Sequence, residues 1–197
     1  MRLIYDYHNF PAHTYKLTWP ARGDHALAGR IERKLSADGV SCELNAERGF
    51  DHGVFVPLKV AVPDADIPTV VLSLRSDFDP DFHLKVGASI ECFREEGVLI
   101  IASGMSYHNL QVMRSGVQSP ESGAFDAWLT ETVQSEALIR DVQLQSWRGA
   151  PFARFCHPTE EHLAPLFVAS GAAGYDVGRC IFTDRVLGGA ISAYRFG

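Results

Sequence analysis

The chain has 197 residues, of which 46% are hydrophobic and 21% are charged, and its formal net charge at pH 7 is −6. This length and composition predict a single globular domain over residues 1–197 and exclude an intrinsically disordered chain. No apolar run approaches the roughly 18 residues of a membrane-spanning helix. The net negative charge argues against the basic face by which nucleic-acid binders hold phosphates. Neither a membrane nor a nucleic acid is therefore expected as a partner.

The N-terminal third predicts a loop followed by a helix. Residues 1–23 are rich in aromatic residues, proline and glycine and are expected to form a structured loop. Asp24 can cap a helix whose apolar residues recur every four positions, and Gly39 is a typical residue at which such a helix ends. One face of this helix is expected to pack and the other to be solvated.

A strand–helix–strand unit is predicted in the middle of the chain. The β-branched run 69–74 (TVVLSL) follows a turn rich in proline and aspartate, a helix follows from Pro80 to Glu96, and Gly97 separates it from the apolar run 98–102 (VLIIA). Parallel strands joined by a helix are buried on both faces. The expected fold class is α/β, with a largely parallel or mixed central sheet covered by helices on both faces.

The C-terminal part predicts two more helices and a strand region. Residues 123–139 form the first helix, and Thr159–Ala173 form the second, with Thr159 as cap and two glutamates in its first turn. Residues 179–196 are expected to form one or two closing strands.

His108 is the first candidate functional residue. It follows the predicted buried strand 98–102 by a few residues, and ligands of open α/β sheets bind at the carboxyl ends of strands. Gly104 allows a sharp turn before it, and Asn109 can orient its ring through a hydrogen bond. The alternative is a histidine that only begins a loop.

His162 and His52 are the other two candidates. His162 is predicted in the first turn of the helix Thr159–Ala173, where the helix dipole favours the neutral ring that a metal requires. His52 lies between two glycines and beside Asp51, which can bias its tautomer. The alternative for His162 is an ordinary helix start without a ligand role, and the alternative for His52 is a tight turn. The hypothesis to test is that the three imidazoles meet at one rim of the sheet.

The remaining histidines and the cysteines point to no further site. His25 and His83 are expected near solvent, and His8 and His13 lie in an irregular segment. The four cysteines are far apart and the N-terminus has no signal segment, which predicts a cytoplasmic protein whose thiols are small core residues.

Five blocks of sequence together resemble the class III extradiol ring-cleavage dioxygenases, in the DOPA-dioxygenase (LigB-like) branch. They occur in the order of that family across nearly the whole chain. The blocks are Ile4-Tyr5-Asp6 with Phe10-Pro11, 48–58 (RGFDHGVFVPL), 63–74 (PDADIPTVVLSL), 94–110 (REEGVLIIASGMSYHNL) and 157–166 (HPTEEHLAPL).

The resemblance implies an oxidoreductase that opens a catecholic ring with O2 in aromatic-compound catabolism, using non-haem Fe(II) or Zn(II). It assigns His162 as a metal ligand, with Glu161 as second choice, and His108 as the general base that later acts as acid. His52 is implied as a catalytic and substrate-binding histidine, and Asn109 is grouped with the substrate-binding residues. The protein is expected to act on a small catechol, and a homo-oligomer is one expected state of assembly.

The family also has two motifs upstream of the position of Ile4, His-Gly-Ser-Pro and Ser-Ala-His-Trp, which supply two metal ligands. Neither occurs here, so the chain is expected to be N-terminally shortened relative to the family. His8 is a weak substitute ligand, and Arg48 or Arg114 is a weak candidate for a substrate carboxylate. The alternative function is a metal-free shortened homologue or binding module without dioxygenase activity.

Overall fold

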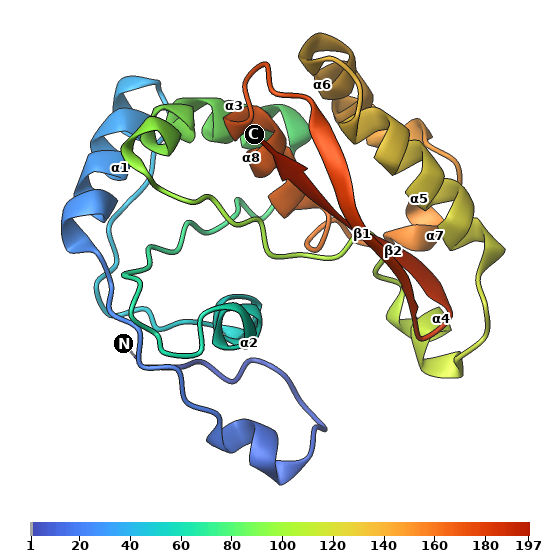
Figure 1. Ribbon diagram of the computed structural model, residues 1–197, viewed down its shortest axis with the longest axis horizontal. Coiled ribbons are helices and arrows are strands. Elements are labelled where there is room, and N and C mark those ends of the chain that lie inside the picture. The colour runs from blue at the N-terminus through green and yellow to red at the C-terminus, as the bar shows by residue number, and fades with distance from the viewer. Residues whose placement is uncertain (1) are drawn as a thin grey trace. The chain divides into compact units, whose positions relative to one another are not determined.

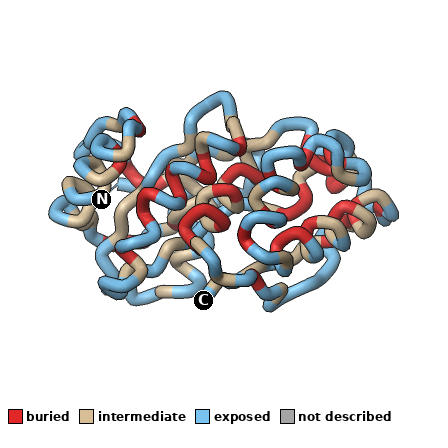
Figure 2. Tube along the Cα trace, turned by 90° about the horizontal axis from the view of Figure 1, so that it is seen from above, coloured by how far each residue is buried: buried red, intermediate tan, exposed pale blue. Residues whose placement is uncertain are grey.

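The computed structural model describes residues 2–197, which fold into two compact units that divide between Ser73 and Leu74. Each unit has its own core, and each is described here by itself. Buried residues recur between exposed ones along the chain (Figure 2). Among the described residues, none of the helices combines the length and the apolar character needed to cross a bilayer.

The first unit, which ends at Ser73, is built around aromatic side chains. Trp19 is its largest buried residue and donates a hydrogen bond from Nε1 to the Val62 carbonyl at 2.9 Å. Two isolated parallel bridges, Leu3 with Phe50 and Gly23 with Thr69, tie its extended segments together. Its helices are η1 (Ala12–Lys16), α1 (His25–Ala37) and α2 (His52–Ala61).

Helix α1 confirms the expected caps. The Asp24 carboxylate accepts a hydrogen bond from the Leu27 N–H at 2.9 Å, which satisfies a donor that the helix cannot pair internally. Gly39 has φ 75°, the left-handed conformation in which glycine commonly ends helices. The sequence did not predict α2, which occupies the segment interpreted as a turn around His52.

The second unit, Leu74–Gly197, contains most of the helices and the strands (Figure 1). Its elements are α3 (Pro80–Ile90), η2 (Glu91–Glu96), α4 (Leu110–Ser115), α5 (Pro120–Val133), α6 (Ala137–Gln145), η3 (Trp147–Gly149), α7 (Ala153–Cys156), α8 (Ala164–Ala172), β1 (Gly178–Val186) and β2 (Gly189–Phe196).

Helices α3 and α8 cross at two glycines. A Cβ atom on Gly87 would lie 2.1 Å from the Val168 carbonyl oxygen, and one on Gly171 would lie 2.0 Å from the Leu84 carbonyl oxygen. Both distances are far inside van der Waals contact, so the two backbones can approach this closely only without side chains at these positions. Beside the crossing lies an apolar core that includes Phe125, Trp147 and Phe167.

A buried arginine fixes the C-terminal end of α8. The Arg140 side chain is fully buried and donates hydrogen bonds to the carbonyls of Ser170, Gly174 and Asp176 at 3.1, 2.9 and 2.7 Å. A cation at this end also complements the helix dipole. Arg140 therefore holds α6 to the end of α8.

Strands β1 and β2 form an antiparallel hairpin and confirm the predicted closing strands. Its turn residues, Leu187 and Gly188, both have positive φ, 49° and 83°, as a tight two-residue hairpin turn requires.

The predicted central sheet is not present in the described residues 2–197, whose one sheet is the β1–β2 hairpin. The runs 69–74 and 98–102 are coil and belong to neither strand, although Thr69 forms an isolated bridge with Gly23. A β-branched sequence favours an extended backbone, but a strand exists only where a neighbouring edge pairs with it. The chain is thus mixed α/β, without helices covering both faces of a central sheet.

Three other expectations also need correction. The predicted helix 123–139 is two helices, α5 and α6, interrupted after Val133, and the short α4 was not predicted. His83 is buried, not near solvent: its Nε2 accepts from the Arg75 N–H at 3.2 Å while Nδ1 donates to the Asp79 carbonyl at 2.7 Å. Of the four cysteines, Cys156 is buried whereas Cys92 is exposed.

Candidate metal centre

Three side chains of the second unit, His108, Glu161 and His162, form one cluster. The Glu161 carboxylate lies 3.6 Å from Nδ1 of His108 and 3.4 Å from Nδ1 of His162, and the two imidazole rings stack at 3.4 Å between centroids. One potential ligand atom from each residue lies within 4.8 Å of the others. The structure therefore brings two of the three predicted histidines together.

The loop that carries His108 is fixed to the segment that carries His162 by backbone contacts. The Met105 N–H donates to the His162 carbonyl at 2.9 Å, and the His108 N–H donates to the Cys156 carbonyl at 3.1 Å. A Cβ on Gly104 would lie 2.2 Å from the same His162 carbonyl oxygen. Gly104 is therefore needed for the close approach of the His108 loop to the His162 segment. This explains why a glycine stands four residues before His108.

Replacing Gly104 with alanine is expected to separate the two segments, because the added methyl group meets a backbone oxygen that cannot rotate away. We expect a loss of about 1–3 kcal/mol in the free energy of unfolding and weaker metal binding. Chemical denaturation and metal titration measure these two effects.

Gly149→Ala is the control, since no atom lies within 4 Å of a Cβ there. Equal behaviour of the two alanine variants would contradict the close-approach role of Gly104.

Asn109 serves the backbone around it. Its side-chain oxygen accepts from the Val112 N–H at 3.2 Å as the N-cap of α4, and its side-chain nitrogen donates to the Phe155 carbonyl at 2.7 Å. Both bonds go to backbone groups, whereas the sequence predicted that Asn109 would orient the His108 ring. Asn109 thus fixes the start of α4 next to His108, and a substrate contact from it stays a prediction.

Glu160 and Glu161 are neighbours with different partners. Glu160 accepts hydrogen bonds at 2.7 Å from both Arg148 and Arg154, and the Arg154 bond is the first cause of its lowered pKa. Burial works to raise the pKa of Glu161, but hydrogen bonds from Thr159 and His162 hold it below the usual value. Glu161 is therefore ionised at neutral pH and faces the histidines.

The prediction that His162 lies in the first turn of a helix is wrong. Helix α8 begins at Ala164, and residues 158–163 form turns, in which the Leu163 N–H bonds to the Glu160 carbonyl at 2.9 Å. A proline at position 165 suits the first turn of a helix, so α8 starts later than the cap signal at Thr159 suggested. His162 therefore precedes α8, and the prediction that the dipole of its own helix favours a neutral His162 ring does not apply.

His157 supports the loop of the cluster and was passed over by sequence reasoning. It is fully buried between Phe125 and Trp147, and its Nε2–H donates to the Ser106 carbonyl at 3.0 Å. Burial lowers the pKa of His157 to about 4. Ser106 precedes His108 by two residues, so His157 helps to hold the His108 loop. Its place at the start of the HPTEEH block was the available signal.

The low pKa of His157 predicts acid destabilisation. The unfolded chain takes up a proton near pH 6.5, whereas the folded protein does so only near pH 4, so stability is lost as the pH falls through this window. We expect about 2 kcal/mol less stability at pH 5 than above pH 7. Urea denaturation of the wild type and of His157→Gln measures it; an identical pH dependence in both would contradict the assignment.

His52 belongs to the first unit, at the start of α2. Asp6 accepts hydrogen bonds from its backbone N–H at 3.0 Å and its Nδ1 at 2.8 Å. Partial burial works to raise the pKa of Asp6, but these bonds hold it below its usual value. Asp51, expected to orient His52, instead pairs with Arg48 at 2.6 Å. The meeting of His52 with His108 and His162 stays a prediction.

The donor set of the cluster fits a non-haem metal. Two imidazoles and one carboxylate are the ligand types of Fe(II) sites with open positions, and zinc accepts the same donors. Among residues 2–197, His108, Glu161 and His162 form the one group of three or more potential metal-ligating residues whose ligand atoms all lie within 4.8 Å of one another. His8 does not belong to this group. The structure thus supports Glu161 beside His162 as a ligand more strongly than the sequence did.

Comparisons with known proteins show which family the chain resembles. The dioxygenase tasH of Hapsidospora irregularis is 36% identical over 99% of this chain and 64% of its own length. The 4,5-DOPA dioxygenase extradiol of Beta vulgaris is 38% identical over 98% of this chain and 73% of its own. The chain thus spans about two thirds of the length of these relatives.

A solved structure shares the fold. The crystal structure of an uncharacterized protein from Escherichia coli K12 has a TM-score of 0.81 and 28% identity, covering 93% of this chain and 77% of that one. The family described as the catalytic LigB subunit of aromatic ring-opening dioxygenase matches residues 1–196. The chain, with its cluster of His108, Glu161 and His162, therefore belongs to the LigB family of aromatic ring-opening dioxygenases.

Proposed function

We propose that the protein is a non-haem metal-dependent extradiol dioxygenase that opens a catecholic ring with O2. The observation that carries this proposal is the His108–Glu161–His162 cluster in a chain that matches the LigB family over residues 1–196. Relatives named as DOPA dioxygenases support a catechol as the substrate class.

In this proposal, His162 and Glu161 hold the metal, which is Fe(II) or Zn(II). When bound, the metal supplies Lewis acidity and open positions at which a catechol and O2 are brought together. Glu161 contributes a negative charge because its carboxyl is ionised at neutral pH. This negative charge favours the binding of a cation beside the two histidines.

His108 is proposed to take the proton from a catechol hydroxyl and to return it later in the reaction. Its side chain is largely but not fully buried, and the Glu161 carboxylate lies 3.6 Å from its Nδ1. A carboxylate at this distance stabilises the imidazolium that forms when the ring accepts a proton. His52, held by Asp6, is proposed to contact the substrate.

Oxygen uptake after anaerobic loading with Fe(II) tests the proposal. Catechols with different side chains are supplied in turn, and metal content is measured on the same sample. Uptake that depends on both metal and catechol is expected. A protein that binds metal at one equivalent without any uptake would overturn the proposed activity, and catechol binding without metal would favour the alternative of a binding module.

The compartment of the protein belongs to the same proposal. All four cysteines are free thiols, and burial raises the pKa of Cys156 to about 12, which leaves its thiol unreactive. Free cysteines are typical of a reducing compartment. This supports a cytoplasmic location.

A further inference from the structure

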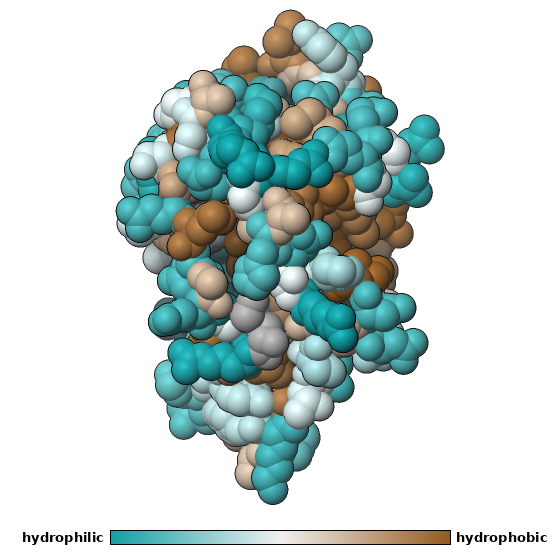
Figure 3. Space-filling view, turned by 90° about the vertical axis from the view of Figure 1, so that its left-hand side faces the viewer, coloured by the Kyte–Doolittle hydropathy of each residue, from teal (hydrophilic) through white to brown (hydrophobic). Residues whose placement is uncertain are grey.

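Strand β1 has an exposed outer edge. Among the described residues it pairs with β2 on one side only, and every residue from Ile181 to Val186 is exposed. Two of its large apolar side chains, Ile181 and Phe182, are 61% and 51% exposed. Apolar side chains also reach the surface elsewhere (Figure 3), so exposure alone does not mark a docking surface. The backbone groups and the charges must also match a partner.

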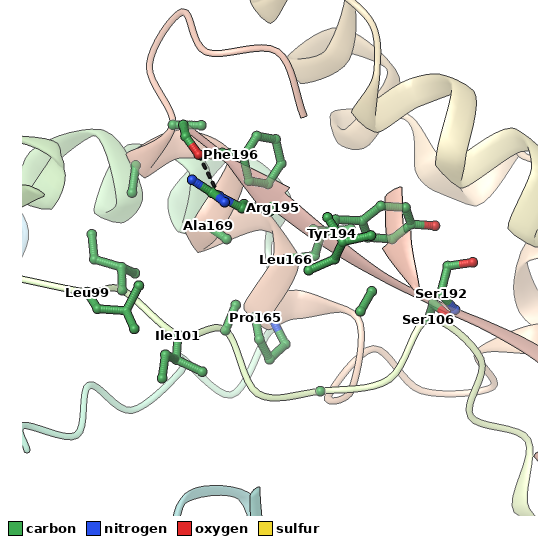
Figure 4. Close-up of a pocket in the computed structure, with 18 of the residues that line it drawn as sticks. Leu99, Ile101, Ser106, Pro165, Leu166, Ala169, Ser192, Tyr194, Arg195 and Phe196 are labelled. Atoms are coloured by element: carbon green, nitrogen blue, oxygen red, sulfur yellow. Dashed lines mark hydrogen bonds between the residues drawn. The ribbon is translucent and has the colours of Figure 1, made fainter. Parts of the chain in front are cut away.

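The backbone of β1 points outward at Cys180 and Thr183. On β2, the Ser192 N–H points away from β1, because it donates to the Ser106 hydroxyl at 2.8 Å (Figure 4). Facing residues of an antiparallel ladder that do not exchange hydrogen bonds both point away from each other, so Thr183, the partner of Ser192, points to the outer edge. Tyr194 follows Ser192 by two residues on β2, and its partner Cys180 therefore has the same direction.

A register shift in β1 places these two outward residues three positions apart. The ladder shifts between Cys180 and Phe182, and Ile181 has no partner on β2. In a regular strand, outward residues are separated by an even number of positions. When two copies of β1 lie antiparallel, Cys180 of each copy can therefore pair with Thr183 of the other. The two-fold axis of this pair passes between Ile181 and Phe182.

Four side chains of β1 lie on the face that is turned away from α5. The Thr183 hydroxyl lies 3.3 Å from the Cys180 sulfur and 3.1 Å from the Ser192 hydroxyl. Ser192 in turn donates to the Asp126 carboxylate of α5 at 3.0 Å, so Cys180 and Thr183 point to α5. Successive side chains of a strand point to opposite faces. The neighbours of these two residues therefore share the other face, and they are Arg179, Ile181, Phe182 and Asp184.

These four side chains are complementary to themselves about the same two-fold axis. Arg179 of each copy lies opposite Asp184 of the other, and Ile181 of each copy lies opposite Phe182 of the other. Both charged side chains are exposed. One oxygen of Asp184 accepts a hydrogen bond from the Arg185 N–H at 2.7 Å, and the other oxygen can accept from an arginine. Apolar pairs and opposite-charge pairs both stabilise facing strands.

We propose that β1 is a dimerisation edge, to which a second copy of this chain adds its own β1 as an antiparallel strand in this register. Bulges and charges usually keep an edge strand unpaired. Here the register shift instead brings opposite charges together at both ends of an apolar centre. A second copy is the partner because the pattern matches itself, as a two-fold interface requires. The proposal does not depend on the metal or on the proposed dioxygenase activity.

Sedimentation velocity of the 197-residue chain over a range of concentrations tests the proposal. We expect a monomer–dimer equilibrium for the wild type. Arg179→Glu and Asp184→Arg should each weaken the dimer by at least about tenfold, because each variant places like charges opposite each other at two points. The double variant with both changes should recover the wild-type affinity, because the charges are then exchanged. An equal mixture of the two single variants should form a heterodimer as tight as the wild-type dimer, since all its facing charges are opposite in sign.

Arg33→Glu is the matched control, because it makes the same charge reversal at an exposed residue of α1. It should leave the dimer affinity unchanged, and thermal unfolding of all variants shows that they fold. A wild-type chain that stays monomeric up to concentrations of about 1 mM would overturn the proposal. A dimer whose affinity is the same in the wild type and in both single variants would also overturn it, since the copies would then meet at another surface.

Discussion

The Gly171→Ala protein is expected to lose at least about 3 kcal/mol of stability, the largest loss predicted here for a single methyl group. Adding atoms to a packed interior usually costs about 1–3 kcal/mol, and here the new Cβ would lie 2.0 Å from the Leu84 carbonyl oxygen. Because that oxygen belongs to the backbone of α3, relief requires the two helices to move apart. Thermal unfolding should show a drop of about 10 °C or more.

Gly123→Ala provides the contrast within the same unit. Gly123 lies inside α5, and the nearest atom to its added Cβ is a flexible Arg185 nitrogen at 4.0 Å. Alanine favours a helix over glycine by about 0.5–1 kcal/mol, so this variant should be at least as stable as the wild type. A Gly171→Ala protein as stable as Gly123→Ala would show that α3 and α8 do not cross at these glycines.

His162→Ala is expected to abolish stoichiometric metal binding, with an affinity loss of at least about a hundredfold. The variant removes the proposed imidazole ligand and leaves Glu161 as the one remaining proposed ligand. His108→Ala, in contrast, is expected to keep the metal and to lose catechol-dependent oxygen uptake, because it removes the proposed proton acceptor. Metal analysis and oxygen uptake on the same samples separate the two roles.

His13→Ala is a suitable control for this pair, since it removes an exposed histidine of the first unit. Equal metal loss in His108→Ala and His162→Ala would show that both rings are ligands, which the spacing of the cluster also permits. In that case another residue must take the proton, and the role of His108 would be reassigned.

The sequence was sufficient to predict elements whose signals are local. Helix α1 has a cap at Asp24 and a stop at Gly39, and α3 begins at a proline and is followed by η2 up to Gly97. The hairpin at 178–196 was likewise predictable from its β-branched and aromatic residues. In each case the residues that decide the structure are within a few positions of one another.

The sheet and the details of the site depend on distant partners. The run 98–102 has strong strand character, but pairing requires an edge that residues 2–197 do not supply to it. The family resemblance placed His108 and His162 in one site, with Glu161 as a second-choice ligand, but it did not predict the stacking of the two rings or the contacts of Glu161 with both of them. Those follow from Gly104 and Met105 contacting the His162 carbonyl, a contact between positions nearly sixty apart.

Ser106 connects strand β2 to the loop that carries His108 of the metal centre. Its hydroxyl accepts the Ser192 N–H of β2, and its carbonyl accepts the His157 ring that steadies the loop of His108. Ser106 is therefore held from two sides, by strand β2 and by His157. Loosening either of these bonds is therefore expected to weaken metal binding, because both hold the loop that carries His108.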